Sequence, residues 1–428
     1  MQNDYMNFIK RRTLLINKVK KAFPGKKGTI IVCGGFESPR RVFEQESSCY
    51  YLTGLEEPGI VLLIDLDGTS TLYVPQYSAD RAQWVSPALM EGKDQGVRWG
   101  FSEARFLGEP CRGYTLAPSC VTSEYKNLID DLRTKQQQGE LLFAEYPTGK
   151  TLEQSLMLDR LLGPHPSLKE SLVDIAPLLY SMRRIKDAAE LESLYEAIDV
   201  TMAAHEWVSS LIEPGLFEYE LQASIEFIFK SSQGSPAFPS VVASGKNSTI
   251  LHYTRNDQEM KKGDVVVVDI GARVGYYCAD LARTYPVSGI FTDRQREVYD
   301  IVLETQEYIA ELARPGYWIS HKDVPEKSLH HLAVEFLKER GYGDYFNHLI
   351  GHFIGLDVHD VGDYKEPLKE GDVFTLEPGI YIPKERMGIR IEDNYWMTKD
   401  GAICLSDELP RESYAIEEMM EGAHLEEE

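Results

Sequence analysis

Cysteine is scarce in this sequence, and so are basic residues relative to acidic ones. The six cysteines, at 33, 49, 111, 120, 278 and 404, form no Cys-x-x-Cys motif. Such scattered positions fit free thiols in a reducing compartment better than a disulfide framework. The 45 Lys and Arg residues face 68 Asp and Glu, which gives a formal net charge of −23. A chain this acidic repels nucleic acid and anionic membranes, so neither is expected as a partner.

Long apolar runs are also missing. No stretch approaches the roughly 18 apolar residues that a membrane-spanning helix needs. The beginning of the chain, MQNDYMNFIKRRTLL, has neither the apolar core nor the small-residue cleavage site of a signal peptide. We therefore expect a cytoplasmic protein.

The length of 428 residues, 43% of them hydrophobic, indicates a globular protein of two domains. Residues 1–175 are expected to form an α/β domain. Its predicted strands are 29–35, 59–68, 69–75 and 141–147, and its predicted helices are 5–22 and about 78–91. Residues 176–428 are expected to form an α+β domain. Its predicted helices are 187–213, 217–232, 292–313 and 324–340, and its strand pairs lie within 264–287 and 371–399.

Two acids close a short apolar stretch in the second domain, DIGARVGYYCAD at 269–280. With a turn centred on Val274 and Gly275, Asp269 pairs directly with Asp280 in a hairpin. Directly paired residues point to the same side, where two like charges repel each other unless a cation separates them. Cys278 lies within this hairpin, and we interpret it as a buried free thiol.

A second hairpin repeats this arrangement. Glu377 and Glu392 pair around a turn near Lys384 and Glu385, and apolar residues precede each acid. Arg390 shares the strand face of Glu392 and is expected to hold that carboxylate by a charge-assisted hydrogen bond.

Three of the ten histidines fall between these hairpins, in HLIGHFIGLDVHD: His348, His352 and His359. Four carboxylates with one imidazole suit two divalent ions of the Mn, Fe, Co or Zn type, since two dications cancel four carboxylates. A bridging water would then be acidified into a hydroxide nucleophile, as in two-metal hydrolases.

These motifs, together with ILHYTRN at 250–256, TLEPGIYI and GIRIEDN, resemble the pita-bread metallopeptidases, and among them the aminopeptidase P and prolidase group. The resemblance covers 176–410, and RRTLL and SSCYYLTGLEEPGIVLLID resemble the group's N-terminal domain. It implies a pita-bread catalytic domain after a smaller α/β domain. It also implies two divalent ions, most often Mn²⁺ with Co²⁺ or Zn²⁺ as alternatives, and a homodimer or homotetramer.

The resemblance also implies residue roles. Five residues would bind metal: Asp269, Asp280, His352, Glu377 and Glu392. Asp280 and Glu392 would bridge the two ions, and Glu377 would act as general base. Three histidines and two further residues would serve catalysis or substrate binding: His359 on the oxyanion, His252 and His348 on the residue after the scissile bond, and Arg390 and Tyr381 beside them.

Two positions stand apart in this comparison. Trp84 resembles an aromatic residue that a neighbouring subunit lends to the site. Leu349 replaces the glycine that usually follows the first histidine of the HGxGH pattern.

The resemblance leaves several functions open. The first is an aminopeptidase that cleaves Xaa-Pro bonds at peptide N-termini, and the second is a prolidase limited to Xaa-Pro dipeptides. Methionine aminopeptidases usually lack this N-terminal domain, and creatinase-like hydrolases lack the metal ligands. A non-catalytic pita-bread binding module is the remaining alternative, and it would be expected to have lost ligands that are all present here.

Overall fold

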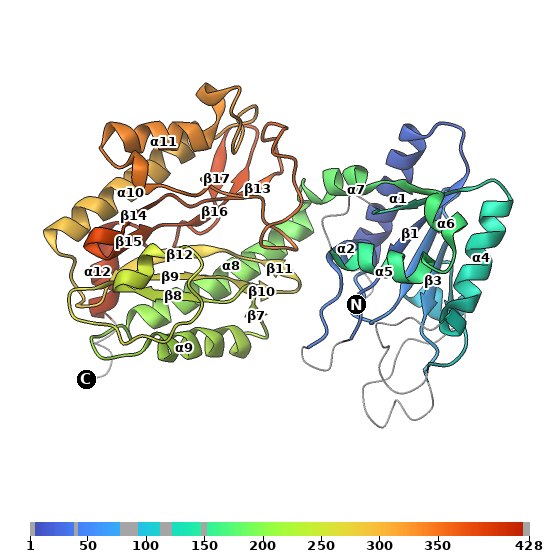
Figure 1. Cartoon of the computed structure of the whole chain (residues 1–428), viewed down its shortest axis with the longest axis horizontal. Helices are drawn as coiled ribbons and strands as arrows, with labels where there is room; N and C mark the ends of the chain where they lie inside the picture. The colour runs from blue at the N-terminus through green and yellow to red at the C-terminus, as the bar shows by residue number, and fades with distance from the viewer. Residues whose placement is uncertain (1–4, 38–41, 78–92, 112–121, 147–151, 423–428) are drawn as a thin grey trace. The chain divides into compact units, whose positions relative to one another are not determined.

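We describe a computed structural model of the chain, covering residues 5–37, 42–77, 93–111, 122–146 and 152–422. The chain forms two compact units, Met1–Arg183 and Arg184–Glu428 (Figure 1). The predicted helix at 78–91, and Trp84 within it, lie outside the described residues. Among the described residues, no helix is both long enough and apolar enough to cross a bilayer.

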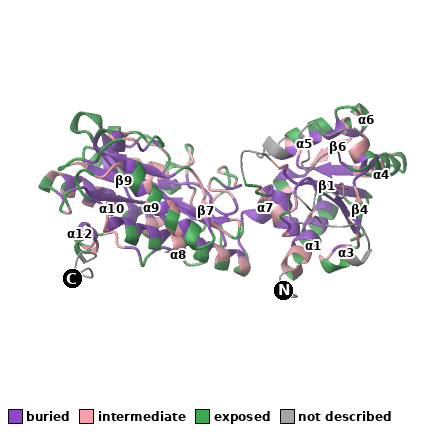
Figure 2. Ribbon diagram, turned by 90° about the horizontal axis from the view of Figure 1, so that it is seen from below, coloured by how far each residue is buried: buried purple, intermediate pink, exposed green. Residues whose placement is uncertain are grey.

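The first unit is built around one mixed sheet of strand order β4-β3-β2-β1-β5-β6. The strands are β1 Gly28–Cys33, β2 Val61–Asp65, β3 Ser70–Val74, β4 Glu103–Phe106, β5 Leu141–Ala144 and β6 Leu172–Asp174. The helices are α1 Tyr5–Ala22, α2 Ser47–Thr53, α3 Lys93–Arg98, α4 Lys126–Gln137, α5 Leu152–Leu162, α6 Pro166–Glu170 and α7 Ala176–Arg183. All six residues of β1 are buried because β1 lies inside the sheet (Figure 2).

The second unit contains several small antiparallel sheets between helices (Figure 1). Its helices are α8 Ala188–Ser209, α9 Glu218–Ser231, α10 Asp293–Leu312, α11 Leu329–Glu339 and α12 Ser413–Gly422. Its first strands are β7 Ser235–Pro236, β8 Val241–Ser244, β9 Val265–Ile270, β10 Ala272–Val274, β11 Tyr277–Cys278 and β12 Leu281–Pro286. The later ones are β13 Val373–Leu376, β14 Gly379–Ile382, β15 Met387–Arg390, β16 Asp393–Met397 and β17 Ala402–Cys404.

The helices of this unit cover opposite sides of the strands. Helix α8 packs on β10, β11 and β12, and α9 packs on β8, while α10 packs on β13, β14 and β15. Asp187 begins α8 with a capping box, in which its side chain accepts from the Glu190 amide and Glu190 accepts from the Asp187 amide. One apolar core runs through these layers, from Val266 and Val268 of β9 to Phe374 of β13. The acid-bearing segments are therefore held between rigid, buried elements.

Candidate metal centre

The second acid hairpin has the predicted register. Gly379 pairs with Arg390 and Ile382 with Met387, while further out Leu376 pairs with Asp393. Glu377 and Glu392 thus occupy corresponding positions at the junction between the β14–β15 ladder and the β13–β16 ladder. The turn closes through Arg386, which has a left-handed backbone with φ of 56°.

The predicted register of the first hairpin is wrong by two residues. Val274 pairs with Tyr277, so the turn consists of Gly275 and Tyr276, which have φ values of 52° and 76°. Two successive positive φ values are typical of a tight type I′ hairpin turn. Asp269 consequently pairs with Ala282 rather than with Asp280. The two aspartates are diagonal neighbours on the same face, a separation that still allows both side chains to reach one site.

His352 lies at the centre of the acids. Its Nε2 is 3.4 Å from Asp280 Oδ2, 3.6 Å from Glu377 Oε1 and 3.9 Å from Glu392 Oε1. Asp280, His352 and Glu392 each offer a ligand atom within 4.8 Å of the others, and all three are buried. The five predicted ligands therefore lie in one region, but not equally close together. These three form the tight group, and Glu377 Oε1 lies near His352 Nε2. Asp269 accepts a hydrogen bond from Arg390.

The carboxylates at this centre are poorly satisfied by the protein. Asp269 Oδ1, Asp280 Oδ1 and Glu392 Oε1 are buried and have no hydrogen-bond partner. Burial, together with the neighbouring acids, raises the pKa of Asp280 to about 7 and raises that of Glu392 well above its usual range. A buried carboxylate is costly unless a proton or a cation neutralises it, and oxygen with imidazole nitrogen is a donor set suited to divalent transition metals.

Histidine protonation fits the same conclusion. Burial opposes a charge on His352, but Asp280 and Glu377 outweigh it and raise its pKa to about 9. The site therefore favours positive charge at this point. A metal ligand must be neutral imidazole, so metal binding here would release a proton.

Arg390 does not hold Glu392, contrary to the sequence-based expectation. Its guanidinium instead forms an ion pair with Asp269 Oδ2 and donates from Nη1 to Tyr381 Oη over 2.9 Å. Because arginine can only donate, the Tyr381 hydroxyl hydrogen is left for His348 Nε2, 2.9 Å away. His348 Nδ1 then donates to the Leu349 carbonyl over 2.8 Å. One chain of hydrogen bonds fixes Asp269, Tyr381 and the tautomer of His348.

A cavity of about 680 Å³ opens onto these residues. Its walls include the predicted residues His252, His348, His359, Glu377 and Arg390, the metal-ligand candidates Asp269, Asp280, His352 and Glu392, and the apolar residues Phe238, Pro239, Val241, Leu251, Leu349, Val358 and Tyr364. His359 is exposed and stacks on His352, with ring centroids 4.0 Å apart. Tyr381 is only 3% exposed and supports the site from behind the wall.

Of two further residues singled out in the sequence, Leu349 lines the cavity and Cys278 does not. Cys278 is a buried free thiol, and its Sγ lies 3.5 Å from the Leu356 carbonyl oxygen. Burial raises its pKa to about 12, so it is a neutral thiol at physiological pH. Leu349 is 45% exposed at the cavity, next to His348.

Several supporting residues were not anticipated from the sequence. Asp393 and Arg283 form a fully buried ion pair, and the Asn394 side chain bonds the backbone of Asp280. Thr375 Oγ1 accepts from the His352 amide and lies 3.4 Å from Glu377 Oε1. Alternation along GIRIEDN places Asn394 on the face of Glu392, which is the signal that could have identified it.

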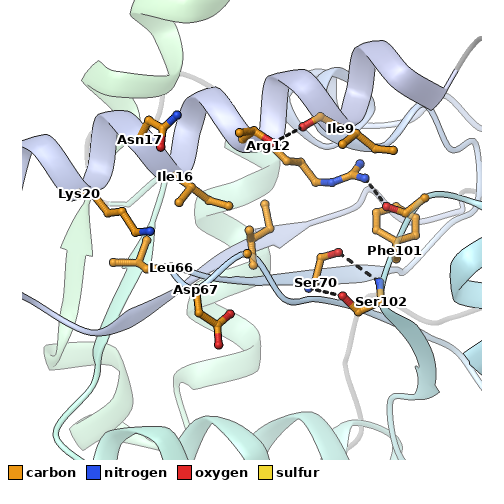
Figure 3. Close-up of a pocket in the computed structure, with 14 residues that line it drawn as sticks. Ile9, Arg12, Ile16, Asn17, Lys20, Leu66, Asp67, Ser70, Phe101 and Ser102 are labelled. Carbon is orange, nitrogen blue, oxygen red and sulfur yellow. Dashed lines mark hydrogen bonds between the residues drawn. The ribbon is translucent and has the colours of Figure 1, made fainter.

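The first unit has a cavity of its own, of about 390 Å³, between α1 and the strands β2 and β3 (Figure 3). The cation buried there is Arg12, which donates to the carbonyl oxygens of Leu52 at 2.8 Å and Gly100 at 2.5 Å. These bonds tie α1 to the end of α2 and to the segment before β4. No histidine and no pair of carboxylates lines this cavity among the described residues.

Comparison with known proteins identifies the family of the chain. The sequence model of metallopeptidase family M24 matches residues 192–399, and that of the aminopeptidase P N-terminal domain matches residues 8–99. The Xaa-Pro aminopeptidase of Escherichia coli (strain K12) is 31% identical over 411 residues, which are 89% of this chain and 90% of that protein. The chain belongs to metallopeptidase family M24.

Other relatives show which M24 metallopeptidases this chain resembles. Zinc-substituted E. coli aminopeptidase P in complex with product has a TM-score of 0.80 and 27% identity, covering 98% of this chain and 99% of that one. The Xaa-Pro dipeptidase of Pyrococcus furiosus is 40% identical over 233 residues, 53% of this chain and 64% of that protein. The predicted architecture, an α/β domain followed by a pita-bread domain of the aminopeptidase P group, is confirmed. Membership in the family implies divalent metal ions.

Proposed function

We propose that the enzyme hydrolyses the Xaa-Pro bond at the N-terminus of peptides. It would hold two divalent ions through Asp269, Asp280, His352, Glu377 and Glu392. The observation that carries this proposal is the cluster of Asp280, His352 and Glu392 ligand atoms within 4.8 Å, with partnerless carboxylate oxygens, at a cavity of about 680 Å³. A cavity of that size accommodates a short peptide segment. The E. coli relative, which spans nearly the whole chain, is named Xaa-Pro aminopeptidase.

Glu377 is the proposed proton acceptor. When bound, the two cations lower the pKa of water and polarise the scissile carbonyl group. Burial raises the pKa of Glu377 to about 6, although His352 and Arg390 oppose the shift. That value belongs to the metal-free site; beside the bound water, the Glu377 carboxylate would take a proton and then return it to the departing amine. Thr375 Oγ1, 3.4 Å from Oε1, orients this carboxylate.

The histidines are the proposed contacts to substrate. Partial burial and the nearby His352 lower the pKa of His359 to about 4, so its neutral ring can donate an N–H group to the carbonyl oxygen as negative charge develops there. His252 is exposed at the cavity and is proposed to hold the residue after the scissile bond. Both ring nitrogens of His348 have partners, so we propose that it contacts this residue through its ring.

The second candidate is a dipeptidase. The P. furiosus relative is named Xaa-Pro dipeptidase and is 40% identical over the part that it shares with this chain. The two activities differ in whether the cavity continues past proline or is closed by a group that binds the free carboxylate. The full-length relative named aminopeptidase, and the match to the aminopeptidase P N-terminal domain, support the first candidate.

Hydrolysis of Ala-Pro and of Ala-Pro-Ala tests this choice, with Mn²⁺ supplied and with a chelated control. Release of alanine from the tripeptide is expected and would establish an aminopeptidase. Cleavage of the dipeptide alone would establish a prolidase. No metal-dependent cleavage of either peptide would overturn the proline assignment and favour a binding module. Glu377→Gln should abolish turnover, and Glu370→Gln, at an exposed glutamate, should not change it.

We make further proposals about the native metal, the oligomer, the compartment and the domain limits. We propose Mn²⁺ as the native metal, with Co²⁺ or Zn²⁺ able to replace it, since the donor set accepts all three. We also propose a homodimer or homotetramer. We propose a reducing, cytoplasmic compartment, which the free thiols of Cys49, Cys278 and Cys404 support. Residues 1–175 are proposed as the N-terminal domain and 176–428 as the catalytic domain.

A further inference from the structure

Each of the two carboxylates at the heart of the site has one oxygen that no hydrogen bond holds. Asp280 Oδ1 and Glu392 Oε1 are buried without a partner, and Asp280 and Glu392 are close enough to repel each other. Each residue also lies at a break between named strands: Asp280 between β11 and β12, and Glu392 between β15 and β16. Besides His352, which lies near both carboxylates, the backbone of the two segments therefore sets the separation of the side chains.

At Asp280 the backbone is held by a side chain. The Asp280 N–H donates to Asn394 Oδ1 over 3.2 Å, and the Asp280 carbonyl accepts from Asn394 Nδ2 over 2.8 Å. Because a primary amide can accept and donate at once, it engages the backbone of one residue as a neighbouring strand would. Asn394 is fully buried, so water does not compete for these bonds.

The same segments are joined two residues away. Ala282 and Glu392 form an isolated antiparallel bridge, with the Glu392 N–H donating to the Ala282 carbonyl over 3.0 Å. Asp280 and Ala282 on one segment are thus fastened to Asn394 and Glu392 on the other. Since Asn394 belongs to the β13-β16-β17 sheet and Asp280 precedes β12 of another sheet, the amide joins the two acid hairpins.

We propose that Asn394 is a positioning residue for metal binding, whose amide sets the distance between the carboxylates of Asp280 and Glu392. This inference rests on the proposed ligand set. It explains why a buried amide follows directly after the Glu392–Asp393 pair. Loss of a group that orients metal ligands typically weakens metal affinity about 10–100-fold.

The chain provides a matched control. Asn256 is also fully buried, and it too links backbone groups: its Oδ1 accepts from the Val242 amide at 3.1 Å and its Nδ2 donates to the Ser240 carbonyl at 2.8 Å. Its hydrogen bonds go to Val242, Gln222 and Ser240, none of which is a proposed ligand. A merely structural role for Asn394 would make the two alanine variants behave alike.

The experiment measures Mn²⁺ affinity and stoichiometry by titration calorimetry for the wild-type protein, Asn394→Ala and Asn256→Ala, with thermal unfolding of each metal-free form. Asn394→Ala should bind Mn²⁺ about 10–100-fold more weakly, whereas Asn256→Ala should lose stability and keep wild-type affinity. Asn394→Asp, which retains the acceptor for the Asp280 amide but not the donor, should fall between wild type and Asn394→Ala. It also serves as the test if the alanine variant fails to fold.

Different outcomes overturn different claims. Wild-type affinity in Asn394→Ala or Asn394→Asp would overturn the positioning role alone. Equal loss of affinity in Asn394→Ala and Asn256→Ala would do the same, because a general loss of packing would then explain both. Absence of Mn²⁺ binding by the wild-type protein would overturn the proposed metal centre and the positioning role together.

Discussion

Glu392 and Asp393 are neighbours in the sequence, both are buried, and the protein treats them in opposite ways. One oxygen of Asp393 accepts hydrogen bonds from Arg283 over 2.8 Å and from Ser406 over 2.7 Å. The other oxygen accepts one from Gln306 over 3.0 Å. Glu392 has an oxygen with no partner, and the pKa of its carboxyl is well above the usual range. Alternation along the strand points one acid into the folded core and the other toward the cavity.

This difference separates structural acids from metal-binding ones. A buried carboxylate with its own cation and hydrogen bonds needs no external cation, and removal of either partner is strongly destabilising. A buried carboxylate that has an oxygen without a hydrogen bond and lies beside three other acids favours binding of an external cation. Arg184 with Asp372 and Lys186 with Asp360 repeat the first pattern in the same unit. The acids around His352 follow the second.

Asp280→Ala should have the largest effect on function. We expect loss of metal binding and at least roughly a thousandfold loss of peptidase activity, because several kcal/mol of metal-derived stabilisation disappear. The metal-free protein should be destabilised much less than by the loss of a fully paired acid, since Asp280 Oδ1 has no partner and Glu377 and Glu392 remain beside His352. Metal analysis, peptide hydrolysis and thermal unfolding measure the three quantities. Full activity with both ions retained would contradict the assignment.

Asp393→Ala should show the reverse pattern. It leaves Arg283 buried without its carboxylate, a change that typically costs about 3–5 kcal/mol of folding free energy. Denaturant unfolding should reveal this loss in the metal-free protein. If Asp280→Ala destabilised the metal-free protein as strongly as Asp393→Ala does, the distinction between the two classes of acid would be false.

Metal removal should destabilise only the unit that carries the site. At a free metal concentration 100 times the dissociation constant, ligation stabilises the folded state by about 2.7 kcal/mol per site. Calorimetry with and without chelator should therefore shift the transition of residues 184–428 and leave that of residues 1–183 unchanged. The shift should be absent in Asp280→Ala.

The first unit offers the smallest and most selective test. Glu46 is buried, and burial together with Glu145 raises its pKa to about 7, opposed by Gln154 and Arg183. The folded state thus binds a proton more tightly than the unfolded chain, so its contribution to stability is present below about pH 4.5 and is lost as the pH rises to about 7. The slope approaches about 1.4 kcal/mol per pH unit in that window.

The measurement is the unfolding of the first unit from pH 4 to 8, in the wild-type protein and in Glu46→Gln. The variant should be less sensitive to pH between these limits. Glu46 Oε1 lacks a hydrogen-bond partner, as Glu392 Oε1 does, but among the described residues the acids and histidines close enough together to hold an ion are Asp280, His352 and Glu392. Added Mn²⁺ should therefore not change the profile. A metal-dependent profile would show that this acid resembles Glu392 more than Asp393.

Local sequence patterns predicted much of the architecture. Helix α1 spans Tyr5–Ala22 as expected, and α10, at Asp293–Leu312, lies within one residue of its predicted limits. The second hairpin has the expected register because its turn residues Lys384 and Glu385 lie midway between the acids. The first hairpin does not, because Tyr276 adopts a positive φ that a non-glycine residue rarely takes. A Cβ at Gly271 would overlap the Ala279 carbonyl oxygen, which is a further constraint that the spacing of acids does not reveal.

The sequence by itself determined which side chains could bind metal, because ligand chemistry and strand alternation are local properties. It placed acids at 269, 280, 377 and 392 and histidines between the hairpins. Only the tertiary structure decided which acids remain unsatisfied. Arg390 bonds Asp269, Arg283 bonds Asp393, and the Asn394 amide bonds the Asp280 backbone. Each of these contacts joins segments about 110–120 residues apart in the sequence. No local rule assigns partners over such distances, because long-range pairing depends on how whole sheets pack.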